Sequence, residues 1–349
     1  MIHVLLLLGC AVAIYFACEW FVNAIEWLGV RLKVGRLAVG TILAAAGTAL
    51  PESVVTLVAV LFGSPEHGND IAVGAAMGGP LVVGTIAYGV TGAMLIWRKT
   101  RTRAAAAAGS ATVQDVASAS AEADELAGVD TGRLARDQTW FLAIFTVKVT
   151  LGLVAFAIKP WLGLAFFAVY TLYFVKEMTG SGEQASGEDL EPLKLQPKRA
   201  VPTTVAVAAQ TLATLVVIFG ASQLFVKQLE WAGPALGLPA VVVALLLSPI
   251  ATELPEIMNA IIWVRQGKSQ LALANISGAM MILATVPSGI GILFTPWKFN
   301  TALILAGAAT MASVIYLLWL LRTHRVTAAR LTAAAGFYAV FAVGLVFTL

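Results

Sequence analysis

Long apolar runs, separated by short polar segments, recur along nearly the whole chain. They lie at about 3–28, 37–62, 70–97, 140–158 and 161–176, and then at 203–230, 239–265, 270–294, 298–321 and 327–348. A helix of about twenty apolar residues crosses the hydrocarbon core of a bilayer, and each run is close to that length. The pattern therefore predicts an all-α polytopic membrane protein with about ten transmembrane helices.

The composition agrees with a membrane protein. Of the 349 residues, 59% are hydrophobic and 12% are charged, and the mean hydropathy is +0.88. Soluble domains typically contain about 25% charged residues. The first run has no basic residues before it and carries Glu19 and Glu26, so we interpret it as the first membrane helix and not as a signal peptide.

Basic residues are concentrated in alternate loops. Eighteen of the 22 Lys and Arg residues fall at 31–36, 98–136, 176–199, 265–268 and 322–330. Cytoplasmic loops carry an excess of Lys and Arg, so these loops are predicted to be cytoplasmic. With an even number of helices both termini then face outward, and we expect a multi-pass protein of the cell (inner) membrane.

Two polar segments divide the chain. The predicted cytoplasmic linker 98–139 contains an alanine run followed by an acidic stretch, and residues 178–202 are rich in Gly, Ser, Glu and Pro. Such compositions are typical of linkers. We therefore expect a first half at 1–177, a flexible connector at 178–202 and a second half at 203–349.

The two halves repeat in sequence. FVNAIEW at 21–27 matches FVKQLEW at 225–231, and the same offset of 204 residues holds as far as position 52. It pairs Thr48 with Thr252, Leu50 with Leu254, Pro51 with Pro255 and Glu52 with Glu256. Since the first half starts outside and the second starts inside, the sequence predicts two inverted five-helix repeats. This arrangement is typical of secondary transporters, which bind their substrate near the midplane between the repeats.

Glu52 and Glu256 are predicted near the middle of membrane helices. A charged carboxylate there is unfavourable by several kcal/mol unless it is protonated, paired or bound to a cation. The proline before each glutamate lacks an N–H, which predicts a broken helix and a free carbonyl at the same depth. With the hydroxyls of Thr48 and Thr252 these groups form an all-oxygen environment, which Ca²⁺ prefers and for which Na⁺ and protons compete. The alternative is a pair of kinked helices whose protonated glutamates only pack.

These motifs resemble those of a known family. GTILAAAGTALPE at 40–52 and SPIATELPE at 248–256 resemble the alpha repeats of the sodium/calcium exchanger family, within the calcium:cation antiporter superfamily. The resemblance is specific over 36–84 and 240–294. It implies ten helices in two inverted halves and alternating access around a central cation site, with the two glutamates as acidic ligands and the two threonines beside them.

The chain also departs from the family pattern. Expected polar residues are replaced in GAAMGGPLVV at 74–83 and in ANISGAMMIL at 274–283, although Asn275 is retained as a candidate amide ligand or packing residue. The replacements are Ala75, Gly79, Val83, Ala279 and Leu283. A serine of the pattern is replaced by Glu253, three residues before Glu256 on one helix face. Adjacent carboxylates rarely both ionise, so Glu253 is a candidate to carry a proton.

Three further charges lie in or near the apolar runs. Lys148 is placed either to neutralise a buried carboxylate or to extend its amine to the membrane surface. Glu26 and Glu230 recur at the repeat offset near membrane ends, where solvation at the interface is favoured over a role in ion access.

The sequence does not predict an enzyme. The His-Glu-x-x-His motif of zinc proteases is absent, and every Asp lies outside the predicted helix interiors, which argues against an intramembrane aspartyl protease. The basic loops lack the interleaved aromatic residues of a nucleic-acid surface. We expect no cofactor, and partners limited to inorganic cations and the lipid bilayer, with the oligomeric state left open.

The predicted function is secondary active cation antiport, with export of Ca²⁺ in exchange for Na⁺ or H⁺ by alternating access. Both glutamates of the repeated motif are present, which favours this function. The alternatives are a monovalent cation/H⁺ antiporter on the same fold, and a non-transporting membrane scaffold or sensor that has lost most of its ligands.

Overall fold

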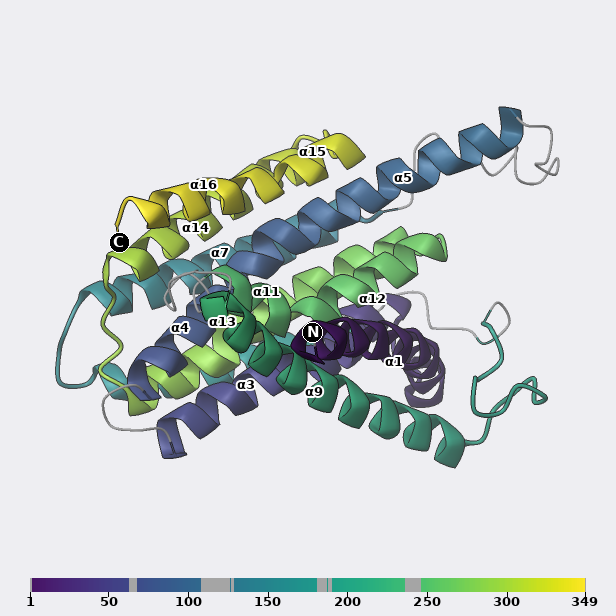
Figure 1. The fold of residues 1–349 in the computed structure, drawn as a ribbon, viewed down its shortest axis with the longest axis horizontal. Coiled ribbons are helices and arrows are strands. Elements are labelled where there is room, and N and C mark those ends of the chain that lie inside the picture. The colour runs from purple at the N-terminus through teal and green to yellow at the C-terminus, as the bar shows by residue number, and fades with distance from the viewer. Residues whose placement is uncertain are drawn as a thin grey trace.

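The computed structural model describes residues 2–62, 68–107, 126, 129–180, 187, 190–235 and 246–348. In the first half these residues form α1 (Ile2–Leu32), α2 (Arg36–Ala38), the π-helix η1 (Val39–Ala44), α3 (Ala45–Phe62), α4 (Gly68–Val82), the π-helix η2 (Val83–Ala87), α5 (Tyr88–Ala107), α7 (Thr131–Leu153), the 3₁₀ turn η4 (Lys159–Leu162) and α8 (Gly163–Thr179). In the second half they form α9 (Thr204–Ala235), α11 (Ser248–Thr252), α12 (Leu254–Arg265), α13 (Ser269–Phe294), α14 (Thr301–Arg322), α15 (Ala328–Ala333) and α16 (Ala335–Val346) (Figure 1).

Seven helical segments of the described chain are long and apolar enough to cross a membrane. They are Leu5–Leu32, Ala72–Thr102, Lys159–Thr179, Thr204–Gln228, Ser269–Phe294, Thr301–Arg322 and Ala328–Val346. The predicted spans 37–62 and 140–158, and the described part of 239–265, are also largely helical but do not meet this criterion. The fold is therefore all-helical and suited to a membrane, while the count of ten spanning helices stays a prediction.

Helix α13 lies at the centre of the packing. It contacts α3, α4, α7, α8 and α12, and nearly all of its side chains are buried. Small residues allow close approach of backbones, since a Cβ atom built on Gly278 would lie 2.0 Å from the carbonyl oxygen of Thr41 in η1. Helices from both halves thus pack around one central helix.

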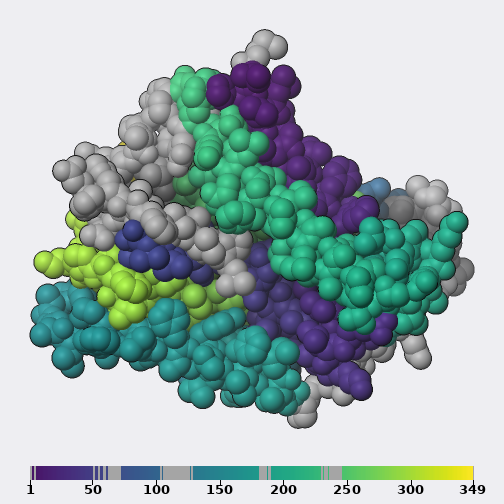
Figure 2. All heavy atoms as spheres, turned by 90° about the horizontal axis from the view of Figure 1, so that it is seen from below, coloured from purple at the N-terminus to yellow at the C-terminus, as the bar shows by residue number. Residues whose placement is uncertain are grey.

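Helices α1 and α9 form a pair on one face of the molecule. They contact each other along much of their length, and Figure 2 shows them side by side on this face, α1 in purple and α9 in green. Both present long apolar side chains outward, including Phe16 and Leu212, which are 56% and 64% exposed. Such an exposed apolar surface suits contact with lipid.

The expected helix break occurs in only one of the two repeated motifs. In the second copy, α11 ends at Thr252 and α12 begins at Leu254, with Glu253 between them at φ −88° and ψ 6°. In the first copy α3 continues through position 51, and the irregular geometry lies earlier, in the π-helix η1. The predicted break beside Glu52 is therefore wrong, because a helix interrupted at one hydrogen bond by proline can continue with a distortion elsewhere.

The polar linkers are only partly described. The middle of the predicted linker 98–139 lies largely outside the described residues, but its two ends are helical, as the last turns of α5 and the first turns of α7. Of the predicted connector 178–202, residues 190–202 pack against α1, since Trp27 Nε1 donates to the Glu191 carbonyl at 2.9 Å and Leu193 is fully buried. That portion is held by tertiary contacts, in contrast to the flexible connector that its composition predicts.

Candidate functional site

Three glutamates from the two halves come close together. Glu52 lies in α3, Glu253 lies between α11 and α12, and Glu256 lies in the first turn of α12. Their exposed fractions are 7%, 1% and 0%. Glu253 interacts electrostatically with both other carboxylates, and Glu52 interacts with Glu256. The residues that the repeat singled out therefore share one buried, acidic environment.

The two threonines of the motif face the glutamates of the opposite half. Thr252 lies beside the Glu52 carboxylate, and Thr48 lies beside the Glu256 carboxylate. Each hydroxyl donates to a carbonyl of its own helix, Thr48 to Ala44 and Thr252 to Pro249, both at 3.1 Å. Because the hydroxyl proton is used in this way, each threonine oxygen is left as an acceptor toward the site.

Several buried polar atoms of α3, α12, α13 and Glu253 have no hydrogen-bond partner among the described residues. They are both carboxylate oxygens of Glu253 and of Glu256, both amide atoms of Asn275 and of Asn259, and Ser53 Oγ. Most buried polar groups in proteins are hydrogen-bonded, because an unpaired one loses its hydration without replacement. The unpaired carboxylate oxygens of Glu253 and Glu256, which interact with each other, are chemically suited to binding a desolvated cation.

The carboxylates alone do not form a metal cage. Within the described part of the chain, no group of three or more His, Cys, Asp and Glu side chains is arranged to hold a metal ion. Ca²⁺ is a hard cation that prefers six to eight oxygen ligands. Neutral oxygens would therefore have to complete its coordination shell. The candidates for these neutral oxygens are the hydroxyls of Thr48 and Thr252 and the amide oxygens of Asn259 and Asn275.

Two of these buried, unpaired polar residues were not predicted from the sequence. Asn259 follows Glu256 by three residues on α12, and Ser53 directly follows Glu52 on α3. The spacing of three residues puts Asn259 on the same face as Glu256 and could have identified it. Asn275 was predicted and is fully buried on α13, which packs against both α3 and α12.

Glu253 lies against a position where the family pattern has a polar residue and this chain has Gly79. A Cβ atom built on Gly79 would lie 2.8 Å from Glu253 Oε1 and 3.2 Å from Leu283. The missing side chain in α4 therefore leaves the space that the Glu253 carboxylate borders. Two departures from the pattern, the gained carboxylate and the lost polar residue, are thus in contact.

Glu26 is paired with charged and polar groups and is not solvated at the interface. Its carboxylate accepts from Lys268 Nζ at 2.6 and 2.7 Å and from Trp263 Nε1 at 2.9 Å. The carboxylate is 8% exposed in this pair. The side chain of Glu230, its repeat counterpart, lies outside what the structure describes.

Lys148 neither reaches the membrane surface nor pairs directly with a carboxylate in the described part of the chain. Its side chain is fully buried in α7, so the amine does not reach the membrane surface. It makes no ion pair with a carboxylate in the described part of the chain, and donates instead to the Ala76 carbonyl at 2.8 Å and to Ser288 Oγ at 2.9 Å. The predicted direct pairing with a buried carboxylate is therefore not observed.

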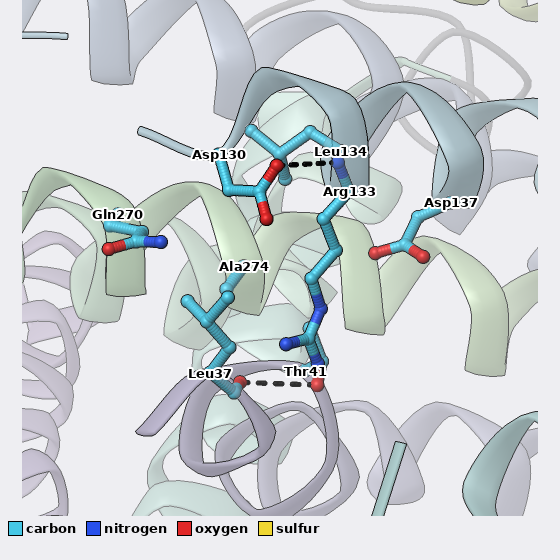
Figure 3. A pocket seen from close by; sticks show the side chains of 8 residues that line it. All are labelled: Leu37, Thr41, Asp130, Arg133, Leu134, Asp137, Gln270 and Ala274. Carbon is cyan, nitrogen blue, oxygen red and sulfur yellow. Dashed lines mark hydrogen bonds between the residues drawn. The ribbon is translucent and has the colours of Figure 1, made fainter. Parts of the chain in front are cut away.

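A second polar cluster lies where α7 begins (Figure 3). Figure 3 shows Asp130, which caps the N-terminus of α7, and Arg133 and Asp137 of α7 facing η1 and α13 across a small pocket, in which Thr41 donates to the Leu37 carbonyl. The space available to the centre of a water-sized molecule there is about 10 Å³, room for about one water. Glu177 of α8 ties the cluster together by pairing with Arg133 and accepting from Thr41 at 3.2 Å. We assign this cluster a structural role.

Comparison with known proteins extends these observations. The model of the sodium/calcium exchanger protein family matches residues 2–176 and 206–349. The solved structure of the sodium-calcium exchanger NCX_Mj soaked with 10 mM Na⁺ and zero Ca²⁺ is similar, with a TM-score of 0.70, 16% sequence identity, and 97% of each chain covered. NCX_Mj soaked with 2.5 mM Na⁺ and 0.1 mM Ca²⁺ gives a TM-score of 0.69 at 17% identity, again with 97% of each chain covered. A comparison with curated proteins finds no match.

At these identities the likeness to NCX_Mj shows the fold, while the family match covers both halves of the chain and the motifs of the site. The apolar helices fit a multi-pass membrane protein. From these observations together, the chain belongs to the sodium/calcium exchanger protein family, a family of membrane cation antiporters.

Proposed function

We propose that this protein exports Ca²⁺ across the cell membrane in exchange for Na⁺ or H⁺ by alternating access. Glu52 and Glu256 bind the transported cation, and Thr48 and Thr252 supply neutral oxygens beside them. Glu253 carries a proton or takes part as a third acidic ligand, and Asn275 contributes its amide oxygen. The two halves act as inverted repeats around this site, with both termini outside.

The observation that carries the proposal is the buried set of unpaired oxygens. Four carboxylate oxygens of Glu253 and Glu256 have no hydrogen-bond partner among the described residues, and all belong to side chains that are at most 1% exposed. Ionised carboxylates in such an environment are strongly unfavourable unless a cation or proton neutralises them. Oxygen ligands of this kind favour Ca²⁺ over softer metals.

The reciprocal contacts of the two threonines support a site shared by the two halves. Each threonine lies beside the glutamate of the other half. A relative movement of the halves would therefore change the ligand shell of both glutamates at once. In such a site Ca²⁺ and the counter-ions compete for the same carboxylates, so that exchange follows without their simultaneous binding.

Radioactive calcium uptake into proteoliposomes tests this proposal. Uptake of ⁴⁵Ca²⁺ is measured under an imposed Na⁺ gradient and then under an imposed proton gradient, for the wild type, Glu52→Gln and Glu256→Gln. Glu191→Gln serves as the control, because its carboxylate is 60% exposed. We expect uptake under one gradient, abolished by either site substitution and unchanged by the control.

The gradient that drives uptake identifies the coupling ion. No uptake by folded wild-type protein under either gradient would rule out calcium transport. Sodium/proton exchange measured in the same vesicles with a pH-sensitive dye would then indicate a monovalent cation/H⁺ antiporter, and its absence would favour the non-transporting scaffold.

A further inference from the structure

Lys148 is buried among electron-rich groups in the interior of the helix bundle. Its Nζ donates to the Ala76 carbonyl of α4 at 2.8 Å and to Ser288 Oγ of α13 at 2.9 Å, and lies 4.7 Å from the centre of the Phe145 ring. A carbonyl oxygen, a hydroxyl oxygen and the face of an aromatic ring all stabilise a positive charge. The surroundings of the amine are therefore those of a bound cation.

The carbonyl that Lys148 uses is one that a proline frees. Pro80 lies inside α4, four residues after Ala76. Because proline has no N–H, it cannot donate the helical hydrogen bond that the Ala76 carbonyl would normally accept. A carbonyl freed in this way is an oxygen ligand for a cation, and here the lysine amine takes it.

The amine and the extra carboxylate of the site both lie against α4. Lys148 binds α4 at Ala76, and the Glu253 carboxylate borders α4 at Gly79. Residues three apart are neighbours on one helix face, so both charged groups approach the same turn of α4. No direct ion pair joins Lys148 to a carboxylate among the described residues, so what the two groups share is their approach to the same turn of α4.

We infer that Lys148 is a tethered ammonium that fills a monovalent-cation position between α4, α7 and α13 and offsets the charge of Glu253. The first part stands on the contacts of the amine alone, and the second rests on the proposed cation site. With this fixed charge in place, a third carboxylate is added without raising the net negative charge of the core. Lys148 is thus a residue that sets how many mobile cations the core accepts.

Chemical rescue tests the cation position. Lys148→Ala removes the atoms of n-propylammonium and leaves the Ala76 carbonyl and Ser288 in place. The midpoint of thermal unfolding of the purified protein in detergent is followed by tryptophan fluorescence against n-propylammonium, n-propanol and tetramethylammonium. We expect a saturable rise for Lys148→Ala with n-propylammonium alone, and no rise for the wild type. Equal rescue by n-propanol would overturn the inference, because it would show that the space is only apolar packing.

Neutral substitution tests the offset of charge and does not depend on Lys148→Ala being folded. Lys148→Met keeps the volume of the side chain and removes its charge. Lys159→Met is the matched control, since Lys159 is also buried but bonds only to backbone carbonyls of Leu151, Val154 and Trp297. Removing a positive charge beside the same turn of α4 should lower the Ca²⁺ or Na⁺ concentration that gives half of the maximal stabilisation on the order of tenfold.

The outcomes separate this inference from the proposed function. Equal half-saturating concentrations for Lys148→Met, Lys159→Met and the wild type would contradict the offset of charge. Wild-type protein that takes up no calcium would contradict the proposed function, while rescue of Lys148→Ala by n-propylammonium would still support the cation position, because unfolding is measured without transport.

Discussion

Gly278→Ala probes the contact on which the arrangement of the central helix depends. A Cβ atom at position 278 would lie 2.0 Å from the Thr41 carbonyl oxygen and 2.6 Å from its carbonyl carbon and Cα. All three are backbone atoms of η1, so no side-chain rotation relieves the overlap. The substitution must push η1 away from α13, three residues after Asn275.

The expected loss of stability follows from two opposing terms. Replacing glycine by alanine inside a helix raises the free energy of unfolding by about 0.5–1 kcal/mol, because the unfolded chain then has less conformational freedom to lose. Overpacking typically lowers the free energy of unfolding by about 1–3 kcal/mol. An overlap with backbone atoms, which cannot rotate away, belongs at the upper end of that range. The free energy of unfolding should therefore fall by roughly 2 kcal/mol.

Gly74→Ala is the matched control for this prediction. Gly74 lies on α4 at the position that aligns with Ala274, and a Cβ atom there would meet no atom of the described residues within 4 Å. It should be neutral or slightly stabilising. The two variants are compared by thermal and denaturant unfolding in one detergent, followed by tryptophan fluorescence. If Gly278→Ala proved as stable as Gly74→Ala, the close contact between η1 and α13 would be refuted.

Two further predictions test contacts of the site and of α1. Thr48→Val and Thr252→Val should each raise the half-saturating Ca²⁺ concentration of uptake roughly tenfold, as expected for loss of one bond to a charged group. Thr48→Ser keeps the hydroxyl and should show the wild-type value. Unchanged uptake in both valine variants would exclude the threonines as ligands. Lys268→Met should lower the free energy of unfolding by about 1–3 kcal/mol, because it leaves the buried carboxylate of Glu26 without its main partner. Lys194→Met, in an exposed pair, should change it by less than about 0.5 kcal/mol, and equal unfolding midpoints of these two variants would contradict the importance of the Glu26 contact.

The helices and the family were accessible from the sequence alone. A run of apolar residues long enough to cross a membrane is a local property, and each predicted run is helical over most of its described residues. The repeated motif around Glu52 and Glu256 is likewise readable as a pattern, and the family match over both halves confirms the resemblance. The count of ten spanning helices and the inversion of the repeats stay predictions.

Contacts between distant segments were decided by the tertiary structure. Thr48 lies beside Glu256 and Thr252 beside Glu52, although each threonine precedes its own glutamate by four residues. The sequence placed these residues in one site, but only packing of α3 against α12 selects the partner.

The charged residues inside the bundle show most clearly what could not be predicted from the sequence. From sequence, Lys148 had two predicted roles and Glu26 was expected at a solvated interface, yet Lys148 binds the carbonyl freed by Pro80 and Glu26 binds Lys268. Hydropathy predicts that a charge in an apolar run needs compensation, because its desolvation is unfavourable. Which atom supplies the compensation depends on the side chains and freed carbonyls that other helices bring within about 3 Å, and that is a property of the packed fold.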